Sequence, residues 1–550
     1  MEGRRNRIKN NELGKKKSIL GIISKVSIVL LTVITIVLFV MVLKLKVIPK
    51  RFLIPLGIIL IALEVLGDYL LIFKKNINKK LKVVLTVISC ILFIVFAFVT
   101  SKVAKMMNFI GALSTDTVNT KTYRVLVLKE SEYTKIEDIE YKLVKYYDTE
   151  LETNKEAIEK LKSAITIVAE QTDDIKDLAN TLIKGDADAI LIEDSNYVII
   201  EEDIEDFREK TKEIYSFTLE DKIDTIAKEV KVTDEPFIIY ISGIDTYGKI
   251  SSVARSDVNM IAVINPKTKQ VLLVNTPRDF YVKLHGTSGY RDKLTHAGIY
   301  GIDMSVKTLE DLFGSDINYY IRVNFSSLIK IIDAIGGVDV YSKYDFTSRI
   351  GKYHFVKGMN HLTGKKALGF ARERYSFAEG DRMRGQNQQA VIDAMIKKVT
   401  SSSTILTKFD KLLDSLKNSF QTNMDFSKIL ELVRMQISDG ATWNITSISV
   451  DGVGSSERTY SMGKTLLYVM IPYSGSVNKA SSMIKQVLNG ETLQAGVIDL
   501  SSYNDYPVVS KGVYPKDTTT KTTKKEEKTN TNTETPTEPT DPNPVDPYED

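Results

Sequence analysis

Three long apolar runs occupy the start of the chain, and short apolar runs alternate with amphipathic stretches after them. The long runs are Val26–Leu43, Phe52–Phe73 and Val83–Val99, each close to the roughly 20 residues that a helix needs to cross a bilayer. A signal peptide would have one short apolar core and a cleavage site. Buried helices of a soluble protein would not be separated only by short basic loops. We therefore expect residues 26–105 to form three transmembrane helices.

The positions of Lys and Arg predict which way these helices face, because cytoplasmic segments are enriched in both residues. Residues 1–25 form a basic N-terminus, and the loop after the second run, residues 74–82, is rich in lysine, whereas the first loop is less basic. We expect the N-terminus and the second loop to be cytoplasmic. An odd number of spans then places everything after residue 105 outside. The expected localisation is the cell membrane, multi-pass, with a large extracytoplasmic domain.

Glu64 and Asp68 lie four residues apart inside the second apolar run. Ionisable groups at membrane depth are costly and often functional. We interpret this pair as facing the other two helices and assign no chemistry to it.

Residues 120–233 alternate between strand-like and helix-like patterns, which predicts a small α/β accessory domain. Tyr123–Lys129 and Ala189–Glu193 have the composition of strands, and Ile136–Tyr147 and Glu156–Val168 have the spacing of amphipathic helices. No motif in this segment indicates a particular chemistry.

Residues 236–490 predict a second, mixed α/β domain with its functional residues at strand ends and loops. Two β-branched runs separated by a short polar turn are typical of a hairpin. The expected strands are Phe237–Ile241, Val258–Ile264, Gln270–Thr276, Ile321–Asn324, Val338–Tyr341 and Ile445–Val450, and the expected helices are Ile302–Phe313, Ser326–Ile335 and Gln386–Lys398. Residues 515–550 are rich in Thr, Lys, Glu, Asn and Pro, so we expect a disordered tail.

Composition excludes several classes of protein. The single cysteine, Cys90, rules out an intramolecular disulfide framework and any zinc site that needs several thiolates. Lys and Arg number 74 against 70 Asp and Glu, a balance that argues against a protein that coats polyanions. The motifs Gly-x-Ser-x-Gly and His-Glu-x-x-His are absent from the sequence, which leaves serine-hydrolase and zinc-protease interpretations with little support.

Arginine and aspartate residues concentrate where the expected strands and helices begin or end. Arg372 and Arg374 are two apart and would share one face of a strand, while Arg384 and Gln388 are four apart and would share one face of a helix. The full set of candidates is Asp245, Arg255, Asp257, Arg278, Arg372, Arg374, Asp381, Arg384 and Gln388.

These residue types suit phosphate chemistry. Guanidinium groups grip phosphate oxygens with two parallel hydrogen bonds, and paired carboxylates hold Mg²⁺, which shares phosphate oxygens. Phosphoryl transfer depends on positioning and charge neutralisation rather than on a protein nucleophile. Surface salt bridges are the better interpretation of any single arginine here, but they explain the whole set less well because the charges cluster at loops between apolar strands.

The same residues fall in a series of blocks that resembles the LytR–CpsA–Psr family of cell-wall phosphotransferases. Each block is weak by itself, but in this order they are highly specific, and the three apolar runs with the accessory domain are similar to the capsule-type branch. The blocks are Gly243–Asp245, Arg255–Asp257, Thr276–Asp279, Lys293–Ala297, Val323–Val338, Leu362–Arg374 and Gly380–Gln389.

The resemblance implies an α-β-α sandwich with a mixed central sheet and an apolar channel for a polyprenyl chain. It also implies transfer of a glycopolymer (capsule, teichoic acid or similar) from an undecaprenyl-pyrophosphate carrier to the C6 hydroxyl of muramic acid in peptidoglycan. Membrane lipid, the lipid-linked glycan and the peptidoglycan acceptor are the expected partners, and no nucleic acid is expected.

The resemblance also assigns roles to residues of this chain. Asp245 and Asp257 would bind Mg²⁺, Asp381 would orient the arginines, and Gln388 would assist them. Lys293 would contact phosphate, and His296 is expected to be a structural hydrogen-bonding residue. The diphosphate clamp would consist of Arg255, Arg278, Arg372, Arg374 and Arg384.

Two other functions use the same features. The family name records a transcriptional-attenuator label, but a regulator would need cytoplasmic contact with DNA, and the expected topology leaves only short basic segments there. A polyprenyl-pyrophosphate hydrolase would use the same residues with water in place of the sugar hydroxyl. One departure from the family pattern is Asn387, where many members carry arginine, and we interpret it as variation within the branch.

Overall fold

The computed structural model describes residues 2–45, 48–74, 77–113, 119–148, 154–204, 206–221, 227–244, 255–287, 289–401, 420–463 and 465–505. The expected tail, residues 515–550, and the candidate metal ligand Asp245 lie outside these ranges. The chain divides into two compact units, one made of Met1–Thr115 with Asp425–Ala441 and the other of the remaining residues.

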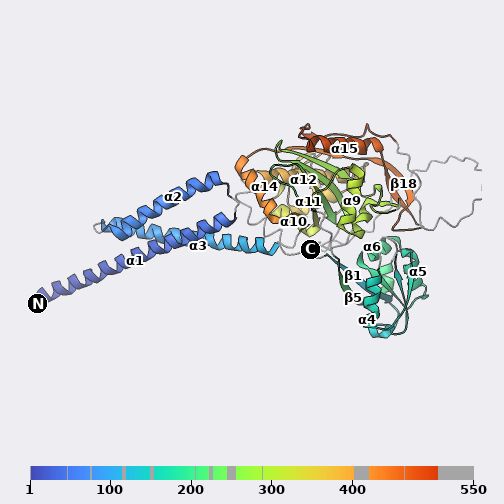
Figure 1. Cartoon of the computed structure of the whole chain (residues 1–550), viewed down its shortest axis with the longest axis horizontal. Helices are drawn as coiled ribbons and strands as arrows, with labels where there is room; N and C mark the ends of the chain where they lie inside the picture. Colours follow the sequence, from blue (N-terminus) through green and yellow to red (C-terminus); the bar gives the residue numbers. More distant parts are fainter. Residues whose placement is uncertain are drawn as a thin grey trace, which may run out of the picture. The chain divides into compact units, whose positions relative to one another are not determined.

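The first unit is helical. It contains α1 (Glu2–Leu45), α2 (Lys50–Asp68), the π-helical turn η1 (Tyr69–Phe73), α3 (Lys79–Leu113) and α14 (Phe426–Asp439) (Figure 1). Within the described residues, three helices are long and apolar enough to cross a membrane, at Leu20–Lys44, Arg51–Phe73 and Lys79–Lys105. These segments contain the three apolar runs from which transmembrane helices were predicted.

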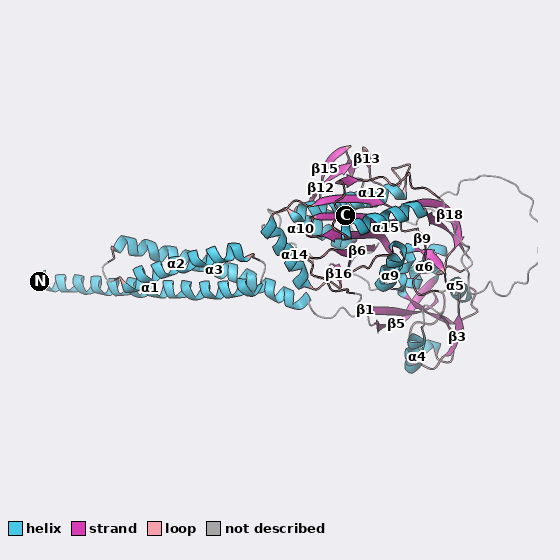
Figure 2. Cartoon of the chain, turned by 45° about the horizontal axis from the view of Figure 1, so that its top comes forward, coloured by secondary structure: helices cyan, strands magenta, loops and turns pink. Residues whose placement is uncertain are grey.

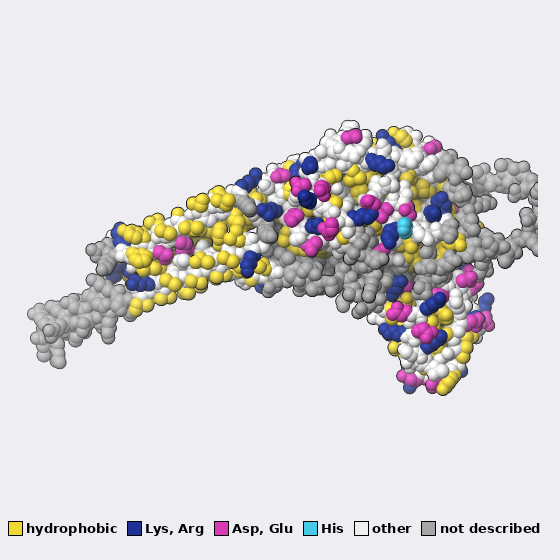
Figure 3. Space-filling view, in the orientation of Figure 1, with side chains coloured by type: hydrophobic (Ala, Val, Ile, Leu, Met, Phe, Trp, Pro, Cys, Tyr) yellow, Lys and Arg dark blue, Asp and Glu magenta, His cyan; other side chains and the backbone are white. Residues whose placement is uncertain are grey.

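Polar side chains of these helices turn toward one another, and apolar ones turn outward. Thr32 and Thr35 of α1 donate hydrogen bonds to the Glu64 carboxylate of α2, at 2.9 and 2.7 Å. Outward-facing Ile58 and Ile94 are 63% and 66% exposed, as expected for side chains that contact lipid. In Figure 3, hydrophobic side chains cover much of the visible surface of these helices, with a few acidic and basic side chains among them. Glu64 therefore faces a neighbouring helix, as the sequence suggested.

The accessory domain is a five-stranded mixed sheet in the order β3-β2-β4-β1-β5. Its parallel strands are β2, β3 and β4, while β1 runs antiparallel to both β4 and β5. Helix α4 packs on one face, and α5 and α6 pack on the other. The bounds are β1 (Asn119–Leu128), η2 (Ile136–Ile139), β2 (Leu143–Tyr147), α4 (Lys155–Ala164), β3 (Val168–Thr172), α5 (Ile175–Ile183), β4 (Ala189–Glu193), α6 (Asp194–Asp203), α7 (Phe207–Lys210) and β5 (Thr211–Asp221).

The expected helix over Ile136–Tyr147 is wrong. A 3-10 turn, η2, is followed by the strand β2, which pairs with β3 and β4 on its two sides. The apolar residues of this segment are spaced as on a helix, but backbone pairing with two neighbouring strands decides the local structure, because tertiary contacts override weak local preferences.

The central sheet of the second domain has seven strands in the order β16-β11-β6-β7-β8-β17-β20. The middle strands β6, β7 and β8 are antiparallel, so the predicted hairpin is confirmed, while β11 runs parallel to β6 and β17 runs parallel to β8. The bounds are β6 (Phe237–Ile244), β7 (Ser256–Asn265), β8 (Gln270–Thr276), β11 (Tyr319–Asn324), β16 (Phe420–Thr422), β17 (Asn444–Ser449) and β20 (Gly496–Val497).

Helices cover both faces of this sheet (Figures 1 and 2). On one face, Val263 and Leu272 pack in a core with Leu309 of α9 (Ile302–Phe313) and Ile484 of α15 (Ser474–Leu488). On the other face lies α12 (Asp381–Thr400), whose Gln389 donates a 2.6 Å hydrogen bond to the carbonyl of Ile448 in β17. The α-β-α sandwich that the resemblance implied is therefore present.

A second apolar core supports α12 from the far side. It joins α12 to α10 (Phe325–Ala334) and α11 (Gly364–Arg372). Strand β12, expected after α10, forms, but it pairs with β15 rather than joining the central sheet. The short paired strands are β9 (Tyr281–Lys283) with β10 (Arg291–Lys293), β12 (Val338–Ser342) with β15 (Gly358–Leu362), β13 (Phe346–Thr347) with β14 (His354–Phe355), and β18 (Gly452–Arg458) with β19 (Leu466–Pro472).

The packing of α10 against α11 predicts the effect of one substitution. A Cβ at Gly364 would lie 2.3 Å from the carbonyl oxygen of Ile329, a backbone atom that cannot rotate away. Gly364→Ala should therefore lower the free energy of unfolding by about 1–3 kcal/mol through overpacking, measured as a lower thermal unfolding midpoint. Lys366→Ala, at an exposed position of the same helix, should leave the midpoint almost unchanged. Equal midpoints for both variants would contradict this account.

Candidate active site

The antiparallel pairing of β7 with β8 places two candidate residues side by side. The pairing brings Asn259 opposite Thr276, so Asp257, two residues before Asn259, lies beside Arg278, two residues after Thr276. Nη1 of Arg278 is 3.1 Å from Oδ1 of Asp257, and both side chains are largely buried. The hairpin register alone therefore produces the first ion pair of the site.

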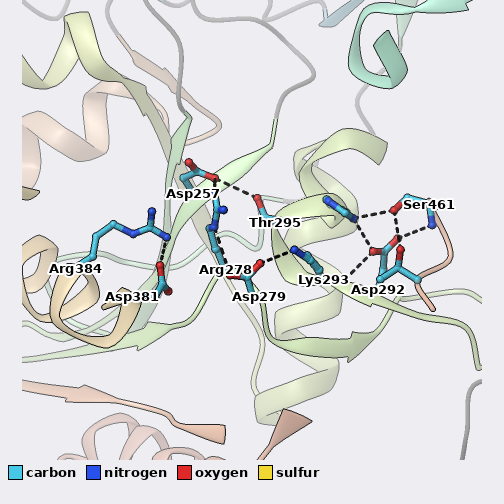
Figure 4. A network of polar contacts seen from close by, with 11 residues as sticks. Asp257, Arg278, Asp279, Asp292, Lys293, Thr295, Asp381, Arg384 and Ser461 are labelled. Carbon is cyan, nitrogen blue, oxygen red and sulfur yellow. Dashed lines mark hydrogen bonds and ion pairs between the residues drawn. The ribbon is translucent and has the colours of Figure 1, made fainter. Parts of the chain in front are cut away.

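The segment after the hairpin adds a second ion pair. The backbone N–H of Thr295 donates to the carbonyl of Arg278 at 2.8 Å, which holds the short helix α8 (Leu294–Ala297) against the turn after β8. As a result, Nζ of Lys293 lies 3.0 Å from Oδ1 of Asp279, and the Thr295 hydroxyl donates to Oδ1 of Asp257 at 3.3 Å. Figure 4 shows these contacts.

Helix α12 contributes a third pair. Asp381 and Arg384, both in its first turn, form an ion pair, the contact that an orienting role for Asp381 requires. The helix lies close to the sheet because Gly385 faces Asn275 of β8, where an added Cβ would meet the Asn275 amide nitrogen at 2.5 Å. Arg384 is near enough to act electrostatically on both Asp257 and Asp279.

The cations keep the buried carboxylates ionised. Burial alone would raise the pKa of Asp257, but Arg278, Arg255 and Arg384 together hold that pKa well below its usual range. Burial also favours a higher pKa for Asp279, but Arg278, Lys293 and Arg384 outweigh it and lower that pKa. The site is thus a set of fixed charges of both signs at neutral pH.

A buried network stands directly behind Lys293. Nδ1 of His296 lies 2.7 Å from Oδ1 of Asp292 and 2.8 Å from Oγ of Ser461, and the Ser461 backbone N–H donates to Oδ2 of Asp292 at 2.8 Å. Both partners use the same ring nitrogen, whereas a nucleophilic serine triad uses the two ring nitrogens separately. His296 therefore has the structural hydrogen-bonding role expected of it, and these residues are not arranged as a triad.

Arg372 and Arg374 do not lie on a strand, so the prediction that they share a strand face is wrong. Helix α11 ends at Arg372, and Arg374 lies in the connection to α12, because Phe370 and Ala371 belong to the helical core beneath them. The Arg372 guanidinium lies 4.2 Å from the ring centroid of Phe325, and Arg374 donates a 2.7 Å hydrogen bond to the Tyr375 hydroxyl.

The remaining candidates differ in how far the structure describes them. Arg255 acts electrostatically on Asp257. Gln388 is partly exposed on α12, one helical turn after Arg384. Asn387 is buried and donates to the carbonyl of Phe370 at 3.2 Å, so it joins α12 to α11. Asp245 lies outside the described residues.

Two residues of the cluster were missed by sequence reasoning. The Asp279 carboxylate forms an ion pair with Lys293 and lies 3.6 Å from Nε of Arg278. Its position at the end of the block Thr276–Asp279 was a signal that sequence reasoning could have used. Thr295 lies in the block Lys293–Ala297, but threonine residues occur in many loops. Nothing in the sequence alone indicated that its hydroxyl donates a hydrogen bond to Asp257.

Asp257 suits a role as ligand of a divalent ion, the role that the resemblance assigns to it. Its carboxylate is held in the ionised form, and both contacts recorded for it within the described residues use Oδ1, which leaves Oδ2 for a hard cation. No group of three or more His, Cys, Asp or Glu residues that could hold a metal occurs within the described ranges.

Comparison with known proteins identifies the family. A family model described as the LytR_cpsA_psr family matches residues 200–471. A protein of Bacillus cereus named polyisoprenyl-teichoic acid–peptidoglycan teichoic acid transferase TagU is 37% identical over 222 residues, covering 40% of this chain and 71% of the relative. The chain belongs to the LytR–CpsA–Psr family. A protein of the same name from Oceanobacillus iheyensis is 37% identical, covering 39% of this chain and 67% of the relative.

Solved structures of similar proteins include Bacillus subtilis TagV and TagT bound to LI-WTA. TagV is 28% identical with a TM-score of 0.40, over 47% of this chain and 99% of that chain. TagT is 26% identical with a TM-score of 0.39, over 48% of this chain and 94% of that chain. The family match, residues 200–471, covers β6 to β19 of the second domain and the last elements of the accessory domain.

The electrostatics of the site predict a pH dependence of stability. A carboxyl whose pKa is depressed in the folded state stabilises the fold fully above its unfolded pKa of about 3.9, and this contribution is lost as the pH falls through the folded pKa. The difference in unfolding temperature between the natural protein and Asp257→Asn should be constant from about pH 5 to about pH 8 and should shrink below about pH 4.

Asp186→Asn serves as the control, because that side chain is exposed. It should show almost no pH-dependent difference in unfolding temperature. A difference for Asp257→Asn that is as large at about pH 3 as at about pH 7 would show that Asp257 is not held ionised by its neighbours.

Proposed function

We propose that this chain is a membrane-anchored phosphotransferase that moves an anionic glycopolymer, of the teichoic acid or capsule class, from a polyprenyl-pyrophosphate carrier to peptidoglycan. The observation that carries the proposal is the cluster of Arg278, Lys293 and Arg384 around Asp257 and Asp279, assembled from three distant parts of the chain. The names of the family relatives, which are teichoic acid transferases, support the choice of reaction.

The cluster suits a diphosphate because its cations are fixed in place before the ligand arrives. Each cation is held by a carboxylate, Arg278 by Asp257, Lys293 by Asp279 and Arg384 by Asp381. Preorganised charges in a partly buried site stabilise charge that develops on phosphate oxygens without further reorganisation. The carboxylates limit the repulsion between the cations when no ligand is bound.

The proposed reaction replaces the phosphoanhydride bond of the carrier with a phosphodiester bond to the acceptor. The acceptor hydroxyl oxygen attacks the phosphorus that carries the glycan and forms a new P–O bond, while the P–O bond to the polyprenyl phosphate breaks. Polyprenyl phosphate leaves, and the hydroxyl proton passes to water or to a base. Arg278 and Arg384 would hold the non-bridging oxygens, and Lys293 would neutralise charge on the leaving phosphate.

Mg²⁺ is proposed as the cofactor, with Asp257 and Asp245 as its protein ligands. When bound, the ion would neutralise charge on the diphosphate. The ionised state of Asp257 supports this assignment, and so does the fact that its hydrogen bonds to other described residues use Oδ1.

A pair of neighbouring arginines tests the proposed site. Arg384 and Arg382 both lie in the first turn of α12, but Arg384 pairs with Asp381 in the cluster and Arg382 pairs with Asp451 at 2.8 Å, outside it. Arg384→Gln should lower kcat/KM for glycan transfer to peptidoglycan by about 10²–10³-fold, as expected for loss of one preorganised charge. Arg382→Gln should keep nearly full activity.

The assay uses a labelled lipid-linked glycan with and without peptidoglycan, and the phosphorylated products are separated. Attachment of label to peptidoglycan supports transfer, whereas release of free glycan phosphate at the same rate in both samples would support the hydrolase. Equal loss of activity in the Arg384 and Arg382 variants would contradict the proposed role of Arg384 in binding the diphosphate.

The proposed orientation places the second domain outside the cell, and a cysteine label tests it. Val497 is 75% exposed, so Val497→Cys in a Cys90→Ser background should react with a membrane-impermeant maleimide in intact protoplasts. Reaction only after the membrane is permeabilised would favour the cytoplasmic regulator instead.

A further inference from the structure

A short hairpin lies against the connection between α11 and α12. The hairpin consists of β13 and β14 and carries Arg349 in its loop. The backbone N–H of Arg349 donates to the buried Glu373 carboxylate, and the Ser376 hydroxyl donates to the carbonyl of Thr347 at 3.2 Å. These hydrogen bonds fix the hairpin loop beside residues 373–376.

Beneath this contact is an aromatic core that makes the arrangement rigid. Phe346 of β13 packs against Phe355 of β14, Phe370 of α11 and Phe377 of the connection, with ring centroids 4.9, 5.7 and 4.7 Å away. Aromatic pairs at these separations contribute packing energy beyond simple burial. The hairpin loop and the connection are thus joined by both hydrogen bonds and apolar packing.

The consequence is that two guanidinium groups share one aromatic ring. Arg349 lies 4.6 Å and Arg374 4.7 Å from the ring centroid of Tyr375. Arg374 is 6% exposed and Tyr375 is 48% exposed, and Arg349 is exposed at the surface. Tyr375 therefore lies between Arg374, an almost buried cation that is predicted to bind the diphosphate, and Arg349, a cation exposed to solvent.

An isolated cation–π contact on a surface is common and needs no ligand. Arg349 differs because, within the described residues, its guanidinium takes part in no ion pair, although a second cation is held on the same ring. Because the guanidinium groups of Arg349 and Arg374 lie 4.6 and 4.7 Å from the same ring centroid, an anion that binds Arg349 is also attracted by Arg374. Arginine also recognises phosphate with a fixed fork of donors.

We propose that Arg349 and Tyr375 form, next to Arg374, a subsite for a phosphodiester group in the glycan of the donor. The proposal rests on the proposed function and specifies its substrate class. With the diphosphate at the buried cations, the glycan extends outward, and the first backbone phosphates of an anionic polymer meet Arg349. The phenol ring of Tyr375 keeps the two guanidinium groups in place.

The test compares two donors that differ only in the glycan charge. The full-length protein in detergent is supplied with a polyprenyl-pyrophosphate disaccharide, or with the same disaccharide extended by glycerol phosphate units. Arg349→Gln should raise KM for the extended donor roughly tenfold, the effect of losing one charge-assisted hydrogen bond. KM for the neutral donor and kcat for both donors should change by less than about twofold.

Matched variants separate charge from structure. Arg349→Gln keeps the backbone hydrogen bond to Glu373, and Arg349→Lys should retain part of the effect of the charge. Lys357→Gln removes the same charge at an exposed position that follows β14 and should change neither KM. An equal rise in KM for both donors would overturn the proposal, because it would place Arg349 on the shared diphosphate, and unchanged values for both would overturn it too.

A binding measurement separates this proposal from the proposed function. Soluble poly(glycerol phosphate) is titrated into the natural protein and into Arg349→Gln, with neutral dextran as the control polymer. Weaker binding of poly(glycerol phosphate) by the variant supports the subsite even if neither donor is transferred, a result that would refute the transferase. Equal binding by both proteins, together with normal transfer, would refute the subsite alone.

Discussion

The candidate site depends on the ion pair between Asp257 and Arg278, and that pair depends on the register of β7 against β8. Both side chains are largely buried, so neither charge is stable there alone. A shift of the strands by one residue would turn Asp257 to the opposite face of the sheet. The apolar faces of the two strands, buried beneath α9 and α15, fix that register, so the hydrophobic core and the charge cluster are specified by the same pairing.

Further charges are then added in layers around this pair. Lys293 is the last residue of β10, directly before α8, and α8 is held by a backbone hydrogen bond from Thr295 to Arg278. The buried Asp292–His296–Ser461 network supports the same turn from behind. Arg384 arrives through α12, whose first turn follows Gly380 and whose position is fixed by Gln389. The cluster consequently contains cations and carboxylates in alternation, and each carboxylate keeps a depressed pKa or a paired cation.

Sequence reasoning predicted the parts of this architecture that follow from strong local patterns. The β7–β8 hairpin and α9 were predicted with nearly the observed bounds, and each predicted apolar run lies inside one of the three long apolar segments, although α1 and α3 extend well beyond the runs. The helix expected over Ile136–Tyr147 and the strand expected at Arg372–Arg374 were wrong, because in both segments neighbouring elements decide the backbone conformation. Long-range proximity could be predicted only through the family resemblance, and Thr295 and Arg349 carry no local signal of their contacts.

The separation of the cluster along the chain has a consequence for the life of the protein. Asp257 and Arg384 are more than a hundred positions apart, yet they influence each other electrostatically in the folded domain. Ribosomes synthesise the strand that carries Asp257 long before the helix that carries Arg384, so a nascent or truncated polypeptide lacks the Asp381–Arg384 pair. The complete cluster of charges therefore forms only after the whole domain has been synthesised.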